Sequence, residues 1–292
     1  MGVDWHRYLM STARDVVADD AGDLDDDAPA FISGQLLCRH AAEVGVPVVE
    51  ITVRRAAVLA AFLRACRQAD AVGVVVVPAG IRNKHPGAAA AVLKGVVASA
   101  RAGRHDRPLV VVARADTRPL WFAPGSDAVD AGLERVARDL DAGFGAIGIG
   151  LDLVGDGDSL ARLCGVLAAG DVGIELEVGA GEDAALLLAE IDDRGLPVSA
   201  IRGANVADDV GRATRVVDLA EVRAVDEVGA GGLRVNIDAL IDNALRRVDP
   251  DDDDAVEATA WMAISRALTA LKAAGSATAL AEALALDDGS AA

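Results

Sequence analysis

The sequence is poor in aromatic residues and in paired cysteines, and each shortage excludes a class of protein. Aromatic side chains make up 3% of the 292 residues, so the core has to be built from the small and aliphatic members of the 52% hydrophobic share. Cys38, Cys66 and Cys164 are odd in number and far apart, which predicts neither a disulfide framework nor a cysteine metal site. Free thiols in apolar stretches fit a reducing cytoplasm.

Positive charge is also scarce. The formal net charge is −18 at pH 7, and Lys84, Lys94 and Lys272 are the three lysines. A nucleic-acid partner is not expected, because neutralising phosphates needs a basic surface. Acidic clusters at 18–29 and 249–255 predict a solvated, self-repelling surface, with cation binding as the alternative interpretation. Many Asp with few Lys also favours a salt-rich, halophilic cytoplasm.

Long apolar runs are missing as well. No run reaches the roughly 18–20 residues that a membrane span needs. The first residues, MGVDWHRYLMSTARDVV, carry acids and contain no apolar signal segment. We therefore expect a cytoplasmic protein with no membrane partner.

Apolar runs of strand length alternate along the chain with segments whose apolar residues recur every three or four positions. Strands that are apolar throughout are typical of a parallel sheet covered by helices on its outer side. Eight of them over about 200 residues predict a (β/α)8 TIM barrel of the α/β class. An open doubly wound sheet is the alternative, although no GxGxxG follows the first strand. The expected strands are 46–53, 71–80, 107–116, 145–153, 172–179, 196–204, 221–228 and 232–238.

We expect a single domain over residues 1–292, with the barrel at about 46–248, an N-terminal helix at 3–18 and terminal helices within 254–286. Active sites of such barrels lie at the C-terminal ends of the strands. Polar residues that stand late in a strand, or just after one, are therefore the candidate site. They are Glu50, Asp116, Asp152, Glu175, Glu177, Arg202, Asn205, Asn236 and Asp238.

Two of these acids lie in one strand, within the stretch IELEVGAGED. Side chains alternate across a strand, so Glu175 and Glu177 are expected on the same face. One interpretation is that neighbouring arginines or backbone groups satisfy them, because buried acids must be paired. The other is a metal or proton-transfer site, in which a cation uses the carboxylates.

IELEVGAGED resembles the (V/L)E-x-E-(L/I)-G-x-x-G-G-x-E-D stretch of class II, zinc-dependent fructose-bisphosphate aldolases, and GLRVNIDALIDNALRR (232–247) resembles their G-(V/I)-x-K-(V/I/M)-N-I-D-T-D segment. The resemblance implies a metal position at Glu177 and substrate contacts at Asn236 and Asp238. VVVARADTRPLW (110–121) stands where the family has its (V/I)-x-L-H-x-D-H strand, which makes Asp116 the match of the catalytic acid/base.

The resemblance implies further site residues, which we assign by role. Catalytic residues would be Asp116 and Glu175, and the metal would be held by Glu177 with Asp152 or Asp208. Groups for the substrate and its phosphate would be Gly231, Gly232, Arg234, Asn236, Asp238 and Asn205, the last from GANVADD in place of F-G-N-V-H-G.

The chain departs from the family at the metal histidines. Thr117 and Ala207 stand where the family has two of them, and no HGGSG stretch occurs. All four histidines lie elsewhere. Tightly bound zinc is therefore not expected, because zinc sites use nitrogen and sulfur ligands. A divalent cation such as Mg²⁺, or weakly held Zn²⁺, is what oxygen ligands would suit.

Three functions remain open. The first is an aldolase-like carbon–carbon lyase of carbohydrate metabolism or glycolysis, with a small phosphorylated sugar as its partner and a homodimer as its assembly. The second is a non-catalytic homologue that serves as a binding or partner subunit. The third is a Mg²⁺-dependent barrel lyase of the phosphoenolpyruvate mutase type, which gives the RVNID stretch no role.

The loop with Arg82, Lys84 and His85 is either a small anion site or an exposed loop.

Overall fold

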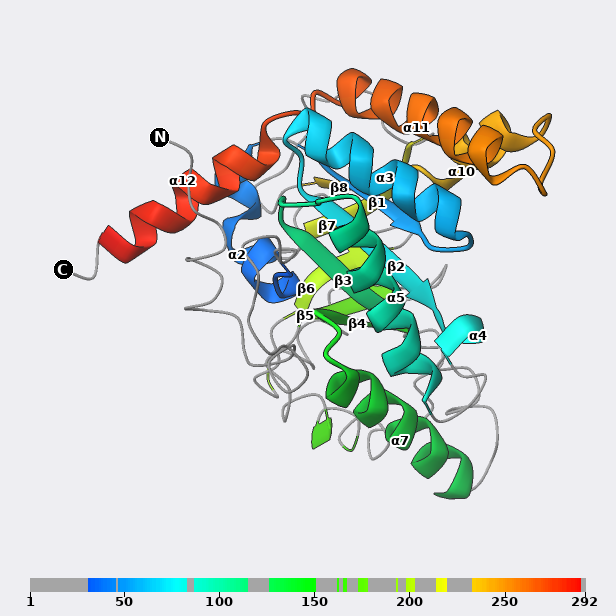
Figure 1. The fold of residues 1–292 in the computed structure, drawn as a ribbon. Helices are drawn as coiled ribbons and strands as arrows, with labels where there is room; N and C mark the ends of the chain where they lie inside the picture. Colours follow the sequence, from blue (N-terminus) through cyan, green and yellow to red (C-terminus); the bar gives the residue numbers. More distant parts are fainter. Residues whose placement is uncertain are drawn as a thin grey trace.

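Eight parallel strands close into a barrel in the computed structural model, each paired with its neighbours in sequence and β8 with β1 (Figure 1). The TIM-barrel prediction is confirmed and the open sheet is excluded. The structure describes residues 31–45, 47–82, 87–114, 126–150, 162, 165–166, 173–177, 193, 198–202, 214–219 and 233–289. The strands are β1 (Val48–Thr52), β2 (Gly73–Pro78), β3 (Leu109–Arg114), β4 (Ala146–Gly150), β5 (Gly173–Glu177), β6 (Val198–Arg202), β7 (Thr214–Asp218) and β8 (Leu233–Asn236).

The prediction for the seventh strand was wrong. β7 is Thr214–Asp218 and not 221–228; it pairs Val216 with Arg202 of β6 and with Arg234 of β8. Its buried apolar core is only Val216 and Val217, so its sequence carries little of the apolar signal of the other strands. Residues 221–228 lie outside the described residues. The other seven predicted ranges each contain an observed strand.

Both faces of the strands are buried, as their continuous apolar sequences predict. Val49 and Ile51 of β1 belong to the large outer core, which includes Phe62 on α3 (Ala56–Ala69). Val48 and Val74 point the other way and belong to a second core that fills the barrel interior. The alternation of side chains along each strand thus separates two cores with a period of two residues.

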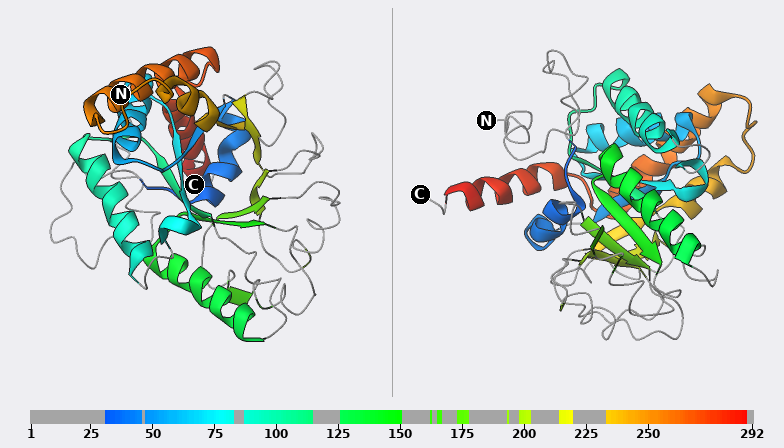
Figure 2. Two further views of the ribbon diagram at one scale, coloured as in Figure 1. Left: turned by 90° about the vertical axis from the view of Figure 1, so that its right-hand side faces the viewer. Right: turned by 90° about the horizontal axis from the view of Figure 1, so that it is seen from below.

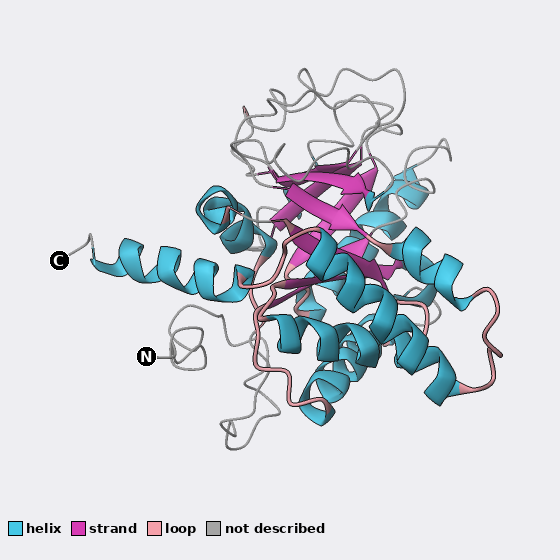
Figure 3. Cartoon of the chain, turned by 90° about the horizontal axis from the view of Figure 1, so that it is seen from above, coloured by secondary structure: helices cyan, strands magenta, loops and turns pink. Residues whose placement is uncertain are grey.

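Helices lie outside the strands (Figure 3). Between β2 and β4 they are α4 (Ala79–Arg82), α5 (Ala88–Ala102) and α7 (Ser126–Ala142), and α10 (Asp238–Leu245) follows β8. α11 (Asp253–Ala270) packs along α3, and α12 (Ser276–Gly289) runs outward from the barrel (Figures 1 and 2). These last two are the expected terminal helices. No helix in the described part of the chain combines the length and the apolar character needed to cross a membrane.

The N-terminal end of the barrel is closed by α2 (Gly34–Val44), a helix that our sequence analysis did not predict. Ser33 caps it by accepting a hydrogen bond from Leu36 N at 3.0 Å, and Gly34 N donates to Gly145 O at 2.8 Å, beside the start of β4. α12 also reaches this end, where Ser276 Oγ accepts a bond from Val72 N. The opposite, C-terminal end carries the polar residues. The helix expected at 3–18 lies outside the described residues.

Candidate functional site

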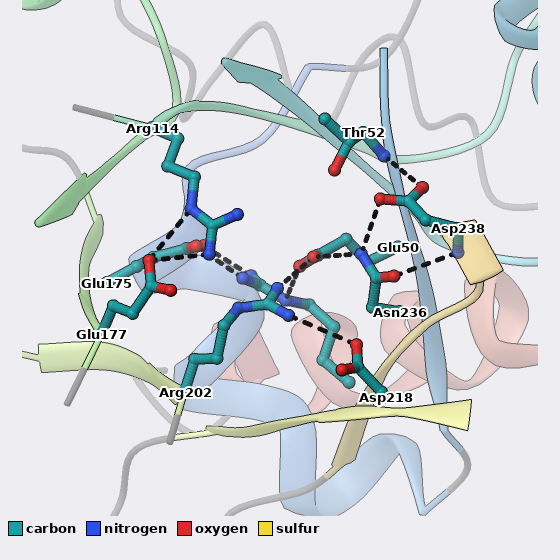
Figure 4. Close-up of polar contacts among 10 residues, drawn as sticks. Glu50, Thr52, Arg114, Glu175, Glu177, Arg202, Asp218, Asn236 and Asp238 are labelled. Carbon is teal, nitrogen blue, oxygen red and sulfur yellow. Dashed lines mark hydrogen bonds and ion pairs between the residues drawn. The ribbon is translucent and has the colours of Figure 1, made fainter. Parts of the chain in front are cut away.

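Charged and polar side chains from six strands meet at the C-terminal end of the barrel, which we call the mouth (Figure 4). The strand register puts them at similar levels: Glu177 stands opposite Arg202, Asp218 opposite Asn236, and Asn236 opposite Glu50. A parallel barrel brings the ends of all its strands to one edge, so residues distant in sequence become neighbours. The mouth residues are Glu50, Arg114, Glu175, Glu177, Arg202, Asp218, Arg234, Asn236 and, at the start of α10, Asp238.

Arg234 is the centre of the network inside the barrel. Its side chain is 4% exposed and its two terminal nitrogens donate to the two oxygens of Glu175, each at 2.5 Å. Its Nε lies 2.8 Å from Oε2 of Glu50 as an ion pair, without hydrogen-bond geometry. Burial lowers the pKa of Arg234, but Glu175 and Glu50 outweigh that effect and raise it above its ordinary value. The guanidinium therefore ties β8 to β5 and β1 across the interior.

Glu50 is fully buried and holds two cations. Besides Arg234, Arg202 donates to its Oε1, and Asn236 Nδ2 donates to the same oxygen at 3.0 Å. Burial alone would raise the pKa of Glu50, but the two guanidinium groups and the hydrogen bonds from Asn236 and Arg202 hold it below its ordinary value. Glu50 is thus an ionised anchor for the arginines and not a free base.

Asn236 and Asp238 brace the turn between β8 and α10. Asn236 Oδ1 accepts a bond from Asp238 N at 3.0 Å, and its Nδ2 donates to Asp238 Oδ2 at 3.3 Å. The other oxygen of Asp238 accepts a bond from Thr52 N at 2.8 Å, which joins the turn to the end of β1. Asp238 is the first residue of α10, so the turn lies at the start of a helix.

The ion pairs at the outer rim of the mouth are more exposed to solvent than those of the interior. Nε and Nη2 of Arg114 both donate to Oε2 of Glu177, at 3.1 and 2.7 Å. The side chains of this pair are 36% and 49% exposed. Nη1 of Arg202 lies 3.8 Å from Asp218 Oδ1, on the same solvent side. Ion pairs of this kind contribute little to stability, because water screens them.

Arg82 is a buried residue of α4 that links the ends of β2 and β3 to α7. Its Nε donates to Val77 O at 3.0 Å, and its terminal nitrogens donate to Asp139 on α7 and to the carbonyl oxygen of Arg114. Burial raises the pKa of Asp139 above its ordinary value, against the lowering effect of Arg82. Arg82 is therefore engaged within the protein, and the interpretation of its loop as an anion site is not supported by Arg82. Residues 83–86 lie outside the described residues.

A small cavity of about 20 Å³, partly open to solvent, lies between these groups. Its polar wall is formed by Arg114, Glu175, Glu177, Arg202 and Arg234, and apolar side chains such as Val76 and Val112 form its floor. Glu175 and Glu177 both line it, which confirms that the two acids share a face. The cavity offers guanidinium donors and carboxylate acceptors over an apolar base. At this size it has room for about one water molecule, so a larger ligand enters only if one of the lining side chains moves.

The structure brings together the seven candidate site residues that it describes. They are Glu50, Glu175, Glu177, Arg202, Arg234, Asn236 and Asp238, and all belong to the mouth. The remaining predicted residues lie outside the described residues and stay predictions: Asp116, Asp152, Asn205, Asp208, Gly231 and Gly232.

Sequence reasoning missed Arg114 and Asp218. Each is the last residue of its strand, and Arg114 ends the otherwise uncharged stretch LVVVAR. A charge that terminates an apolar strand was the signal available for Arg114. Asp218 could not be found in this way, because its strand was placed at the wrong residues.

The described residues alone do not fit a metal ion. Over the part of the chain that the structure describes, no group of three or more His, Cys, Asp or Glu side chains is arranged to hold one. Both acids are paired with arginines instead: Glu175 accepts hydrogen bonds from Arg234, and Glu177 accepts them from Arg114. A cation site would need Asp152 or Asp208 beside Glu177, and both lie outside the described residues, so the divalent cation stays a prediction.

Together the eight parallel strands and the helices outside them define a (β/α)8 barrel protein with a charged C-terminal mouth. Solved structures that share the fold include the YdjI aldolase from Escherichia coli K12 (12% identity, TM-score 0.59, covering 84% of this chain and 99% of that one). A fructose-bisphosphate aldolase from Campylobacter jejuni is similar to the same extent (14%, 0.61, 85% and 97%). So is a proposed fructose-1,6-bisphosphate aldolase from Coccidioides immitis (16%, 0.58, 83% and 96%). No family model and no curated protein matches the sequence. At these identities the likeness shows the fold, which is that of aldolases.

Proposed function

We propose that the protein is a class II aldolase-like carbon–carbon lyase that cleaves or forms a phosphorylated sugar through a dihydroxyacetone phosphate-type unit. One observation carries the proposal. The two stretches that resemble the family, IELEVGAGED and RVNID, meet in the mouth through the Arg234–Glu175 ion pair, 59 residues apart in sequence. The aldolase fold of the structural neighbours supports the same activity.

The described residues perform binding and orientation in this proposal. Arg234 holds Glu175 on both oxygens and fixes its position on the cavity wall. Asn236 and Asp238, which hold each other and the end of β1 through hydrogen bonds, would contact the hydroxyl groups of the substrate. A preorganised turn of this kind orients a sugar without the cost of ordering it on binding.

The remaining roles fall on residues outside the described part of the chain. Asp116 moves the proton of the aldol step, and Asn205 contacts the sugar. Backbone N–H groups of Gly231 and Gly232 receive the phosphate, since glycine lets the backbone approach an anion closely. A cation held by Glu177 with Asp152 or Asp208 would polarise the substrate carbonyl when bound.

The proposal is tested by assaying cleavage of fructose 1,6-bisphosphate, and condensation of dihydroxyacetone phosphate with simple aldehydes, with and without EDTA. We expect turnover that Asp116→Asn lowers at least about 100-fold, because a general acid/base typically contributes that much. Asp242→Asn is the matched control; Asp242 is an exposed acid on α10 that pairs with Arg54, so activity should stay within about twofold. Elemental analysis of the same preparation is expected to find no stoichiometric zinc.

A second function is favoured by one feature of the mouth. Each arginine there is already paired with a carboxylate (Arg114 with Glu177, Arg202 and Arg234 with Glu50), so the network is satisfied without a ligand. This fits a non-catalytic homologue that binds a sugar phosphate or a partner subunit. Binding of dihydroxyacetone phosphate without any turnover in the assays above would favour this function over the lyase.

A further inference from the structure

The three arginines of the mouth differ in how firmly they are held. Arg234 and Arg202 both contact the fully buried Glu50, and Arg234 also uses both oxygens of Glu175. Releasing either one would take away one of the two cations that compensate the buried charge of Glu50, which is unfavourable. Among the described residues, Arg114 contacts only an exposed acid through its side chain. It is therefore the arginine that can exchange its partner at little cost.

The contact between Arg114 and Glu177 is one-sided. Two guanidinium nitrogens share the single oxygen Oε2, and no described residue donates to Oε1 of Glu177. A guanidinium prefers two parallel bonds to two oxygens, as a phosphate or an unstrained carboxylate offers. A ligand oxyanion in the cavity could thus satisfy Arg114 better than Glu177 does.

The backbone of Arg114 is anchored, whereas its half-exposed side chain contacts Glu177 at the rim of the mouth (Figure 4). Its carbonyl oxygen accepts a bond from the buried Arg82, which is itself anchored to Asp139 and Val77. On the neighbouring strand Gly148 stands opposite Arg114 in the register, and a Cβ at Gly148 would lie 3.6 Å from Cγ of Arg114, so the stem of Arg114 lies close against β4. Arg114 and Gly148 both line the small cavity.

We propose that Arg114 is an oxyanion-binding residue, and that a phosphate or carboxylate group of the ligand displaces Glu177 from it. The proposal deepens the proposed function and rests on it for the choice of sugar phosphate as ligand. It adds a consequence: a bound oxyanion releases the Glu177 carboxylate into the cavity. Anion binding and the availability of Glu177 are then linked, so that each favours the other.

The experiment is calorimetric titration of inorganic phosphate, dihydroxyacetone phosphate and acetate into the full-length protein at fixed ionic strength. Arg114→Gln should weaken binding of the preferred anion at least about tenfold, because a charge-assisted pair is lost. Glu177→Gln should strengthen it about three- to fivefold, because the internal competitor is removed. Both side chains are partly exposed, and thermal unfolding of each variant checks that the fold is retained.

Two controls separate exchange from a general effect of charge. Asp218→Asn removes one negative charge from the same mouth but from the partner of Arg202, so it should change affinity by less than about twofold at physiological salt. In the Arg114→Gln background, Glu177→Gln should no longer strengthen binding. Equal gains from Glu177→Gln and Asp218→Asn would overturn the proposal.

The outcomes also distinguish this inference from the lyase. Unchanged anion affinity in Arg114→Gln overturns the role of Arg114. Whether the protein is a lyase is then decided by the turnover assay, which is a separate measurement. Absence of binding to both wild type and Glu177→Gln at millimolar ligand overturns the inference as well. Preference for phosphate over acetate identifies the ligand group as a phosphate ester, and the reverse preference identifies a carboxylate.

Discussion

Arg234 is the single side chain on which the interior of the mouth depends. Arg234→Met would remove the cation shared by Glu175 and the fully buried Glu50 while keeping a similar volume. We expect the free energy of unfolding to fall by about 3–5 kcal/mol, because the nearly buried Glu175 loses its described cation and the fully buried Glu50 keeps only Arg202. Urea unfolding at pH 7 measures the loss.

Arg114→Met is the matched control, since it removes an arginine of the same barrel end from an exposed pair. Its expected cost is about 1 kcal/mol or less. A similar loss in both variants would show that the interior network does not carry the stability assigned to it. Arg234→Lys should recover only part of the loss, because an ammonium cannot make the two parallel bonds to Glu175.

His105 gives the protein a pH dependence away from the mouth. It is buried, its Nδ1 lies 3.1 Å from Leu63 O, and Nε2 has no described partner. Burial lowers its pKa from 6.5 to about 4, outweighing the raising effects of Leu63 O and Asp106. Between pH 6.5 and pH 4 the imidazole of His105 is therefore protonated in the unfolded chain and neutral in the folded one. The folded state keeps its full stability above pH 6.5 and loses stability as the pH falls towards 4. The loss is on the order of 3 kcal/mol at most.

His105→Gln removes this titration and can still donate to Leu63 O. Urea unfolding midpoints between pH 7 and pH 4.5 should decline less steeply in the variant than in the wild type. Glu50 acts at lower pH, because its lowered pKa makes its stabilisation disappear only below its ordinary value of 4.5. The raised pKa of Asp139 makes stability change with pH in the opposite direction. Because Asp139 is present in both the wild type and the variant, its contribution cancels in the comparison. Identical slopes in the two proteins would contradict the assignment to His105.

At the scale of the elements, the strands that sequence reasoning found are those buried on both faces. GVVVVP in β2 and LVVVAR in β3 are apolar at every interior position, so their period and length are unambiguous. β7, with two buried valines between Arg215 and Asp218, gives no such signal. Its strand character comes from pairing with β6 and β8, which is tertiary information that a local window does not contain.

α2 was missed for a related reason. Its local signals, Ser33 at the N-cap and Gly45 in the left-handed conformation (φ 63°) at the C-cap, are present. These signals precede the first strand, however, and the alternation of strands and helices in a barrel does not predict a helix before the first strand. Its place is set by close backbone approach: a Cβ on Gly173 would lie 2.9 Å from backbone atoms of Gly34 and Gln35. Such a contact between distant glycines is visible only in the folded chain.

The candidate site was predictable in membership and not in pairing. Strand ends could be read from the sequence, and six of the residues chosen there meet in the mouth. Which acid faces which arginine depends on barrel closure and register. Glu175, at the third position of β5, reaches Arg234 at the second position of β8 across the interior. The two open interpretations of Glu175 and Glu177 were therefore undecidable from the strand alone, and arginine pairing is what the described residues show.

At the scale of the whole molecule, negative charge dominates. The chain has 46 acidic and 28 basic residues, and acids such as Asp251, Asp253 and Asp254 crowd the exposed approach to α11. Like charges repel one another more strongly in the compact state than in the expanded unfolded chain, so the excess opposes folding. The surface ion pairs, such as Arg64 with Glu257, offset only part of this repulsion, because the net charge of −18 remains.

Salt should therefore stabilise the protein. Raising KCl from about 0.1 M to about 1 M shortens the Debye length from roughly 10 Å to 3 Å, which suppresses repulsion between surface acids. The network around Arg234 and Glu50 is buried and is screened far less. We expect the thermal unfolding midpoint to rise steeply up to about 1 M KCl and to level off above it. Sucrose, which strengthens burial without screening, should give no such saturation. A midpoint that stays flat or falls with KCl would mean that screened ion pairs outweigh the relieved repulsion, and would contradict the expectation of a salt-adapted protein.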